Sequence, residues 1–196
     1  MTAPRAAHVV RHTSETRIEL TLTLDGEGRA DISTGLGFYD HMLTALTRHG
    51  RLDLTVRCQG DTHVDDHHTV EDVALALGAA LDQALGDKRG VRRFGSAYAP
   101  LDEALARSVI DLSGRPFADV HLGFTRERIG EVATENLTHF FVSLAAAARL
   151  TLHVDTLKGS NDHHKAEAAF KATALALRAA IALDAHDQVP STKGSL

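Results

Sequence analysis

Polar and apolar residues follow two different periods along the first half of the chain. Residues 17–24 alternate between polar and apolar side chains, which predicts a strand with one buried face. Residues 67–85 repeat apolar side chains at helical spacing and end before Gly86, which predicts a long helix. In chain order, the pattern predicts strand 17–24, turn 25–28, return strand 30–33, helix 40–48, strand 52–56 and helix 67–85.

The second half of the chain predicts the same order again. Its elements are a hairpin of strands 105–111 and 117–122, helix 135–148, strand 150–154 and helix 163–183. Histidines and acidic residues recur at matching places in the two halves. Asp66-His67-His68 recurs 96 positions later as Asp162-His163-His164, and Glu71 recurs at the same offset as Glu167. His41 recurs 98 positions later as His139. These matches predict an internal duplication of about 90 residues within one domain. The repeats then cover about 8–92 and 93–185, followed by a tail at 186–196.

Composition narrows the class of protein. The chain has 196 residues, 43% of them hydrophobic and 24% charged, as in an ordinary globular domain. A net charge of -5 predicts no binding to nucleic acid or to an anionic membrane surface. No apolar run is long enough for a membrane span, and residues 1–17 lack the apolar core of a signal peptide. With a single cysteine, Cys58, these features predict a cytoplasmic location.

Histidine is the compositional anomaly, with thirteen copies against one cysteine, so a metal site here would use imidazole and carboxylate. Residues three apart share a helix face, so His68 with Glu71, and His164 with Glu167, can face one ion, whereas adjacent histidines diverge by about 100°. The recurring residues form two sets of three histidines and one glutamate. One consistent partition is His41, His68, Glu71 and His163 for one ion, and His139, His164, Glu167 and His67 for the other.

The expected surroundings of these residues also favour ligation. Asp66 and Asp162 precede the histidine pairs and are predicted to cap the two helices. The positive end of a helix dipole disfavours imidazolium, which would keep the rings neutral. Three imidazoles and one carboxylate with open positions suit octahedral Mn²⁺ or Fe²⁺ better than tetrahedral Zn²⁺.

Several basic or hydroxyl residues are candidates for binding an anion. Arg115 lies in a tight turn at 113–116, and Lys171 lies one helical turn beyond Glu167. Further candidates are the basic segment 88–95, which includes Arg93, the tail residues Ser191, Thr192 and Lys193, and His49 near a site helix. By composition alone the tail reads as irregular, and Glu15 reads as a surface acid.

Six ordered segments together resemble the imidazoleglycerol-phosphate dehydratase family of histidine biosynthesis. They are GFYDHML at 37–43, HHTVED at 67–72, GDKRGVRRFG at 86–95, DLSGRP at 111–116, HHKAEA at 163–168 and PSTKG at 190–194. The resemblance spans about residues 8–196, without the phosphatase domain of some bacterial members. It implies an α+β fold built from an internally duplicated unit of the ribosomal protein S5 domain 2-like type. Each half is then a four-stranded sheet with two helices packed on one face.

The resemblance also implies roles for the candidate residues. The eight histidines and glutamates match the family's ligands for two Mn²⁺ per active site, in sites formed between the subunits of a 24-subunit assembly. Glu15 matches the catalytic acid/base, and the tail becomes an ordered lid on the substrate phosphate. The residues matching the phosphate-binding set are Arg93, Arg115, Lys171, Ser191 and Lys193; Thr192 and His49 are further expected substrate contacts.

The implied activity is that of a hydro-lyase, which converts D-erythro-imidazole-glycerol phosphate into imidazole-acetol phosphate and water. The carbon that loses hydrogen has no neighbouring carbonyl, so an imidazolate held by two metals would serve as the electron sink, with Glu15 moving the proton through a diazafulvene-like intermediate. One alternative is another di-metal enzyme, a hydrolase or an oxidase, which predicts no role for Arg115, Lys171 or the tail. Another is a non-catalytic metal-binding protein, which predicts metal uptake without turnover.

Overall fold

The computed structural model describes residues 5–184, 188–194 and 196; parts of the predicted tail, at 186–187 and 195, lie outside the described residues, as do residues 1–4 and 185. The first half forms a sheet whose strands lie in the order β1-β2-β4-β3, with one helix between β3 and β4 and a second helix after β4. Its elements are β1 (Ala6–His12), β2 (Thr16–Thr23), β3 (Ala30–Ser33), α1 (Gly37–Gly50), β4 (Asp53–Gly60) and α2 (His67–Leu85).

The second half repeats this arrangement, with its sheet in the order β5-β6-β10-β7. Its elements are β5 (Phe94–Leu101), β6 (Ala104–Asp111), β7 (Phe117–His121), α3 (Thr134–Ala147), β10 (Thr151–Lys158) and α4 (Asp162–Ile181), with a small inserted hairpin of β8 (Arg128–Ile129) and β9 (Val132–Ala133) before α3. The predicted α+β fold of duplicated four-stranded sheets, each with two helices, is confirmed.

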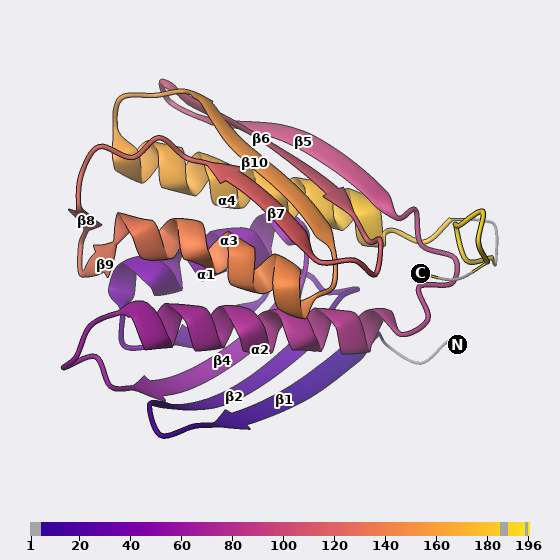
Figure 1. The fold of residues 1–196 in the computed structure, drawn as a ribbon, viewed down its shortest axis with the longest axis horizontal. Helices are drawn as coiled ribbons and strands as arrows, with labels where there is room; N and C mark the ends of the chain where they lie inside the picture. The colour runs from indigo at the N-terminus through magenta and orange to yellow at the C-terminus, as the bar shows by residue number, and fades with distance from the viewer. Residues whose placement is uncertain (1–4, 185–187, 195) are drawn as a thin grey trace.

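The helices form a middle layer between the two sheets (Figure 1). Helix α1 packs against α4, and α2 packs against α3, so each helix contacts a helix from the other half. The rings of Phe140, Phe141 and Phe170 pack together in the buried core. Both α2 and α4 begin at the same end of the molecule (Figure 1), which brings the two histidine-rich helix starts to one side. None of the helices in the described part of the chain is long and apolar enough to cross a bilayer.

The two predicted hairpins are wrong. Strand β3 pairs in parallel with β4, and β7 pairs in parallel with β10, so neither returns against the strand before it. The hairpins of the structure are β1 with β2 and β5 with β6. The sequence pattern does not predict strands β1 and β5, because both lie at sheet edges and β5 is rich in small residues. Close packing explains why β5 has a glycine at position 95, since a Cβ there would lie 1.9 Å from the carbonyl oxygen of Ala176 on α4.

The single cysteine lies on β4 inside the first half, so the reactivity of its thiol reports on the packing of that strand. Cys58 is only 9% exposed, and burial raises the pKa of its thiol to about 12. At pH 8 only about one native thiol in ten thousand would be ionised, and only the thiolate is alkylated. We therefore expect iodoacetamide to label native protein at least about 100-fold more slowly than protein unfolded in guanidinium, as followed by intact mass. Equal labelling rates in the two states would contradict this burial.

Candidate active site

Two groups of three ligand-type side chains form where helices from the two halves meet. His41, His163 and Glu167 make one group, and His67, Glu71 and His139 make the other, each with ligand atoms within 4.8 Å of one another. These two groups are called the α4 group and the α2 group below, after the helix that carries each glutamate.

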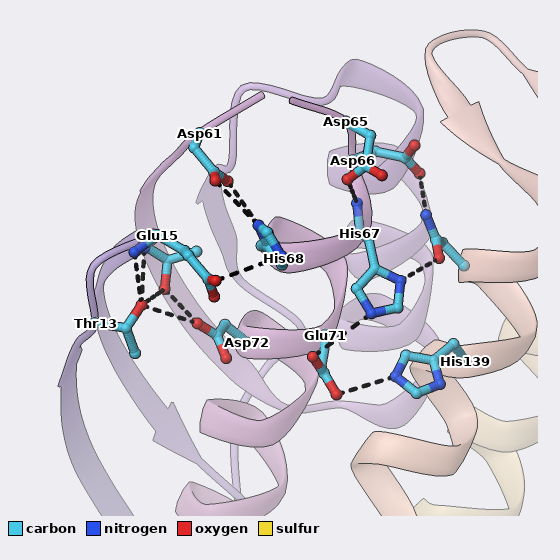
Figure 2. Close-up of polar contacts among 12 residues, drawn as sticks. Thr13, Glu15, Asp61, Asp65, Asp66, His67, His68, Glu71, Asp72 and His139 are labelled. Atoms are coloured by element: carbon cyan, nitrogen blue, oxygen red, sulfur yellow. Dashed lines mark hydrogen bonds and ion pairs between the residues drawn. The ribbon is translucent and has the colours of Figure 1, made fainter. Parts of the chain in front are cut away.

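In each group the glutamate lies between two imidazoles. In the α4 group, Oε2 of Glu167 is 3.1 Å from Nε2 of His41 and 3.4 Å from Nε2 of His163. In the α2 group, the carboxylate of Glu71 is 3.1 Å from Nε2 of His139 and 3.7 Å from Nε2 of His67 (Figure 2). Each group thus joins a histidine–glutamate pair from one half to a histidine from the other half, and the Nε2 atoms converge on a carboxylate.

The predicted partition of the ligands differs from these groups. On each helix the glutamate faces the histidine four residues earlier, His67 or His163, rather than the histidine three residues earlier. Both spacings share a helix face, so the sequence alone did not decide between them. As a result Glu71 lies with His67 and His139, and the predicted set of His41, His68, Glu71 and His163 is not brought together in the chain.

His68 and His164 diverge from the two groups and lie against other carboxylates. Nδ1 of His68 is 3.0 Å from the Asp61 carboxylate (Figure 2), and Nδ1 of His164 is 2.7 Å from Glu103. These hydrogen bonds raise the pKa of both histidines, and the bond from His164 lowers the pKa of Glu103 to about 2. At these two rings the carboxylates favour the protonated form and so act against the expected effect of the helix dipole, which favours the neutral form.

The predicted helix caps hold only for the position of Asp66, which is the N-cap residue of α2 but makes no capping hydrogen bond; the N-cap residue of α4 is Asn161 instead of Asp162. The side chains that accept a hydrogen bond from the histidine backbone N–H are Asp65 for α2 and Asn161 for α4. Asp66 instead accepts from the side chain of Asn136, whose Oδ1 lies 2.9 Å from Nδ1 of His67. The aspartates that directly precede the histidine pairs thus connect the helix starts to neighbouring segments, and Asp162 likewise accepts hydrogen bonds from Thr125 and Arg126.

Glu15 lies beside one of the candidate ligands. It occupies the β1–β2 turn, and its Oε1 is 3.6 Å from Nε2 of His68 (Figure 2). The turn is fixed by Thr13, whose Oγ1 accepts the backbone N–H groups of Glu15 and Thr16. Thr16 in turn donates to the buried carboxylate of Asp72 on α2. No pattern in the sequence indicates this position, because it depends on the hairpin formed by β1.

Lys171 reaches the α4 group, as its helical position predicts. Its Nζ is 2.6 Å from Oε1 of Glu167. Although burial opposes the shift, hydrogen bonds from Lys171 and His41 lower the pKa of Glu167. Partial desolvation and the charge of the nearby Lys171 lower the pKa of His49, an exposed residue of α1. A glutamate that stays ionised between an ammonium and two imidazoles is suited to bind a cation.

The remaining anion-binding candidates lie far from both groups in the same chain. The backbone of Arg93 donates to the carbonyl of Ala180, thirteen residues beyond Glu167 on α4, which corresponds to about 20 Å along the helix. The guanidinium of Arg93 is 2.6 Å from Asp111 and donates to the carbonyl of Pro190 in the tail. The other end of the molecule therefore holds these residues (Figure 1).

The Arg115 turn and the tail lie at that same end. The hydroxyl of Ser113 fixes the turn by accepting the backbone N–H of Arg115, whose side chain is exposed. A Cβ on Gly114 would lie 2.6 Å from the backbone of Leu196, so the end of the tail rests against the turn. Ser191 is half-buried, and Thr192 and Lys193 are exposed. Within one chain, these residues are not brought to the metal-ligand groups.

The donor chemistry of both groups fits a divalent transition metal. Each group offers two imidazole nitrogens and one carboxylate, a set of borderline and hard ligands that suits Mn²⁺ or Fe²⁺ and leaves further positions open. The only cysteine is buried on β4, so thiolate plays no part. The two groups match in composition, so both are candidate sets of metal ligands.

Comparison with known proteins identifies the family. The family model of imidazoleglycerol-phosphate dehydratase matches residues 34–177. The chain belongs to the imidazoleglycerol-phosphate dehydratase family. A dehydratase of this name from Zymomonas mobilis is 56% identical over 194 residues, covering 98% of this chain and 99% of the relative. Another, from Phytophthora nicotianae, is 56% identical, and this chain spans only 42% of its length.

The fold comparison agrees with this family. The crystal structure of imidazoleglycerol-phosphate dehydratase from Staphylococcus aureus superposes with a TM-score of 0.82 at 37% identity. The match covers 91% of this chain and 99% of that structure. The dehydratase family resemblance and fold predicted from the sequence are therefore confirmed.

Proposed function

We propose that this protein dehydrates D-erythro-imidazole-glycerol phosphate to imidazole-acetol phosphate and water, using two Mn²⁺ held by its eight candidate ligands. Membership of the family supports the reaction, which makes the chain a hydro-lyase of histidine biosynthesis. The single observation that carries the site is the pair of matching groups, each with two imidazoles around one carboxylate.

Each group contributes three ligands, and a fourth comes from a neighbouring copy of the chain. His68 and His164 turn away from both groups of their own chain, which supports a role for their imidazoles as ligands to the metal of another chain. The active site then forms only between subunits, in an assembly of 24 copies. Bound Mn²⁺ supplies Lewis acidity at the imidazole nitrogens of the substrate and so favours withdrawal of electrons into that ring.

Glu15 is the residue that moves the proton. The reaction removes a proton from one carbon and hydroxide from its neighbour, and the resulting enol becomes the ketone by tautomerisation. Glu15 lies 3.6 Å from a candidate ligand, His68, and therefore beside the place where the substrate ring would bind. Its carboxylate takes the proton from carbon and returns it to the carbon of the enol, while the enol O–H proton joins the departed hydroxide to form water, so the enzyme is left unchanged.

The substrate phosphate is held by a different copy of the chain from the one that supplies a metal group. The backbone of Arg93 lies about 20 Å along α4 from Glu167 of its own chain, too far for one small substrate to span, and Arg115 and the tail lie at the same end of the molecule as Arg93. The proposed phosphate contacts are Arg93, Arg115, Ser191, Thr192 and Lys193 from one copy, with Lys171 and His49 beside the metal group of another. We place the reaction in the cytoplasm, where a free thiol such as Cys58 stays reduced.

A turnover assay tests the proposed function. Purified protein is incubated with MnCl₂ and imidazole-glycerol phosphate, and the product is identified by mass spectrometry as the ketone that is one water lighter. We expect product with added metal and none after chelation. Unchanged substrate in the metal-loaded protein would refute the dehydratase function, release of inorganic phosphate would favour a hydrolase, and oxygen uptake would favour an oxidase.

A further inference from the structure

We infer that Asp61 and Glu103 are positioning residues that set Nε2 of His68 and His164 as the metal-binding atom. The inference rests on the proposed function, because it assumes that these two histidines serve a metal site. It concerns two carboxylates that lie outside both ligand groups and that no sequence pattern indicates.

The first contact joins Asp61, directly after β4, to His68 at the start of α2. Both carboxylate oxygens of Asp61 lie within hydrogen-bond distance of Nδ1 of His68, at 3.0 and 3.1 Å (Figure 2). The backbone N–H of Asp61 donates to the carbonyl of Glu15, so the carboxylate is tied to the same turn as the proposed acid/base. The Asp61 side chain is 18% exposed, which limits its freedom.

The second contact joins Glu103, in the β5–β6 turn, to His164 at the start of α4. Oε2 of Glu103 is 2.7 Å from Nδ1 of His164. The other oxygen accepts the backbone N–H groups of Ser160 and Asn161, at 3.1 and 2.8 Å. With a further bond from the Ser160 hydroxyl, four hydrogen bonds thus hold one carboxylate between the helix start and the histidine ring.

The same carboxylate–imidazole contact is built from two different places in the fold. Asp61 follows the fourth strand of its half, whereas Glu103 lies in the turn between the first two strands of the other half. An offset of 96 positions from Asp61 leads to Leu157, so the two acids are not copies of each other. Duplication explains the two histidines but not the two carboxylates, which indicates that the contact itself is required.

The consequence for the ring follows from its tautomers. A neutral imidazole carries one N–H, and a carboxylate at Nδ1 holds the proton there, which leaves the lone pair on Nε2. The carboxylate also fixes the orientation of the ring and makes it a stronger ligand. His67 shows a related arrangement, since its Nδ1 faces Asn136 and its Nε2 faces Glu71. Nε2 is thus the atom presented by these rings.

Metal titration without substrate tests the inference. Apo protein, wild type or carrying Asp61→Ala or Glu103→Ala, is titrated with MnCl₂ by calorimetry, and its mass is followed by light scattering. We expect each alanine variant to bind the Mn²⁺ served by its histidine about 10- to 100-fold more weakly. Asp61→Asn and Glu103→Gln, which keep an acceptor oxygen, are expected to lose less affinity than the alanine variants.

The matched control is Glu19→Ala, because Glu19 contacts His8 at 3.2 Å on an exposed surface away from the ligand groups. It is expected to bind Mn²⁺ like the wild type. Wild-type affinity in both alanine variants would overturn the inference, whereas a wild-type protein that binds no Mn²⁺ would instead refute the proposed function. If an alanine variant fails to fold, the serine variant at the same position is titrated instead. Its hydroxyl is too short to reach Nδ1, so the same loss of Mn²⁺ affinity is expected.

Discussion

Replacing Glu71 with alanine is expected to remove one of the two proposed Mn²⁺ sites and to lower kcat by at least about a thousandfold, the equivalent of about 4 kcal/mol. Glu71 supplies the only carboxylate of the α2 group, so in the variant only imidazoles remain to hold a divalent cation: His67, His139 and the proposed fourth ligand from a neighbouring copy. Without that charge, His67 and His139 lose the carboxylate that lies between their Nε2 atoms. Metal content per chain, by atomic emission spectroscopy, and turnover at saturating substrate measure the effect.

Glu27→Gln is the control for this loss. Glu27 is an exposed acid that pairs with Arg29 in the turn after β2, away from both groups. Metal content and turnover should match the wild type in this variant. If Glu71→Ala retained full metal content and activity, the α2 group would not be a metal site.

The second large effect is expected from Glu15→Gln, which should lower kcat by about 100- to 10,000-fold while metal binding and assembly stay intact. Glutamine keeps the size and the acceptor oxygen of the side chain but cannot take up a proton. The contacts that fix the turn run through the backbone of Glu15 and through Thr13, so they survive the substitution. Turnover, Mn²⁺ titration and particle mass are measured on the same preparation.

Glu19→Gln controls for loss of a negative charge on the neighbouring strand, since Glu19 is exposed on β2 and far from the ligand groups. Its turnover should equal that of the wild type. Wild-type turnover in Glu15→Gln would remove Glu15 from the mechanism. A parallel loss of metal in that variant would instead assign Glu15 to the metal site.

The sequence was sufficient for the elements whose periodicity comes from burial. Helix α2 covers the predicted residues 67–85, and β2 alternates between buried and exposed side chains as predicted. The recurrence of the histidine pairs was enough to indicate the duplication, because it needs only the spacing of residues along the chain. The edge strands β1 and β5 lack a strong pattern, so the pairing partners of β2 and β6 could not be predicted and two hairpins were assigned wrongly.

Some features of the candidate site could likewise be predicted from the sequence, and others could not. Helical spacing placed Glu71 and Glu167 near their histidines, but spacings of three and four residues both share a face, so the grouping needed the structure. His41 contacts Glu167 through the packing of the two halves, and such a tertiary contact cannot be predicted from spacing along the chain. The acids around His68, Glu15 and Asp61, come from turns whose positions depend on strand pairing. These contacts have no periodic signal at all.

The proposed mechanism requires one active site to combine the metal groups of one copy with the phosphate-binding end of another. Mixing two inactive variants tests this arrangement: Glu167→Gln, which impairs the metal group, and Arg93→Ala, which impairs the other end. Co-expressed with different tags and purified as mixed assemblies, each chain supplies the end that the other lacks. We predict recovery of about a tenth to a quarter of wild-type turnover, as random pairing across subunit interfaces allows. Mixed assemblies as inactive as either parent would contradict the shared site, because a site contained in one chain cannot be rescued by its neighbour.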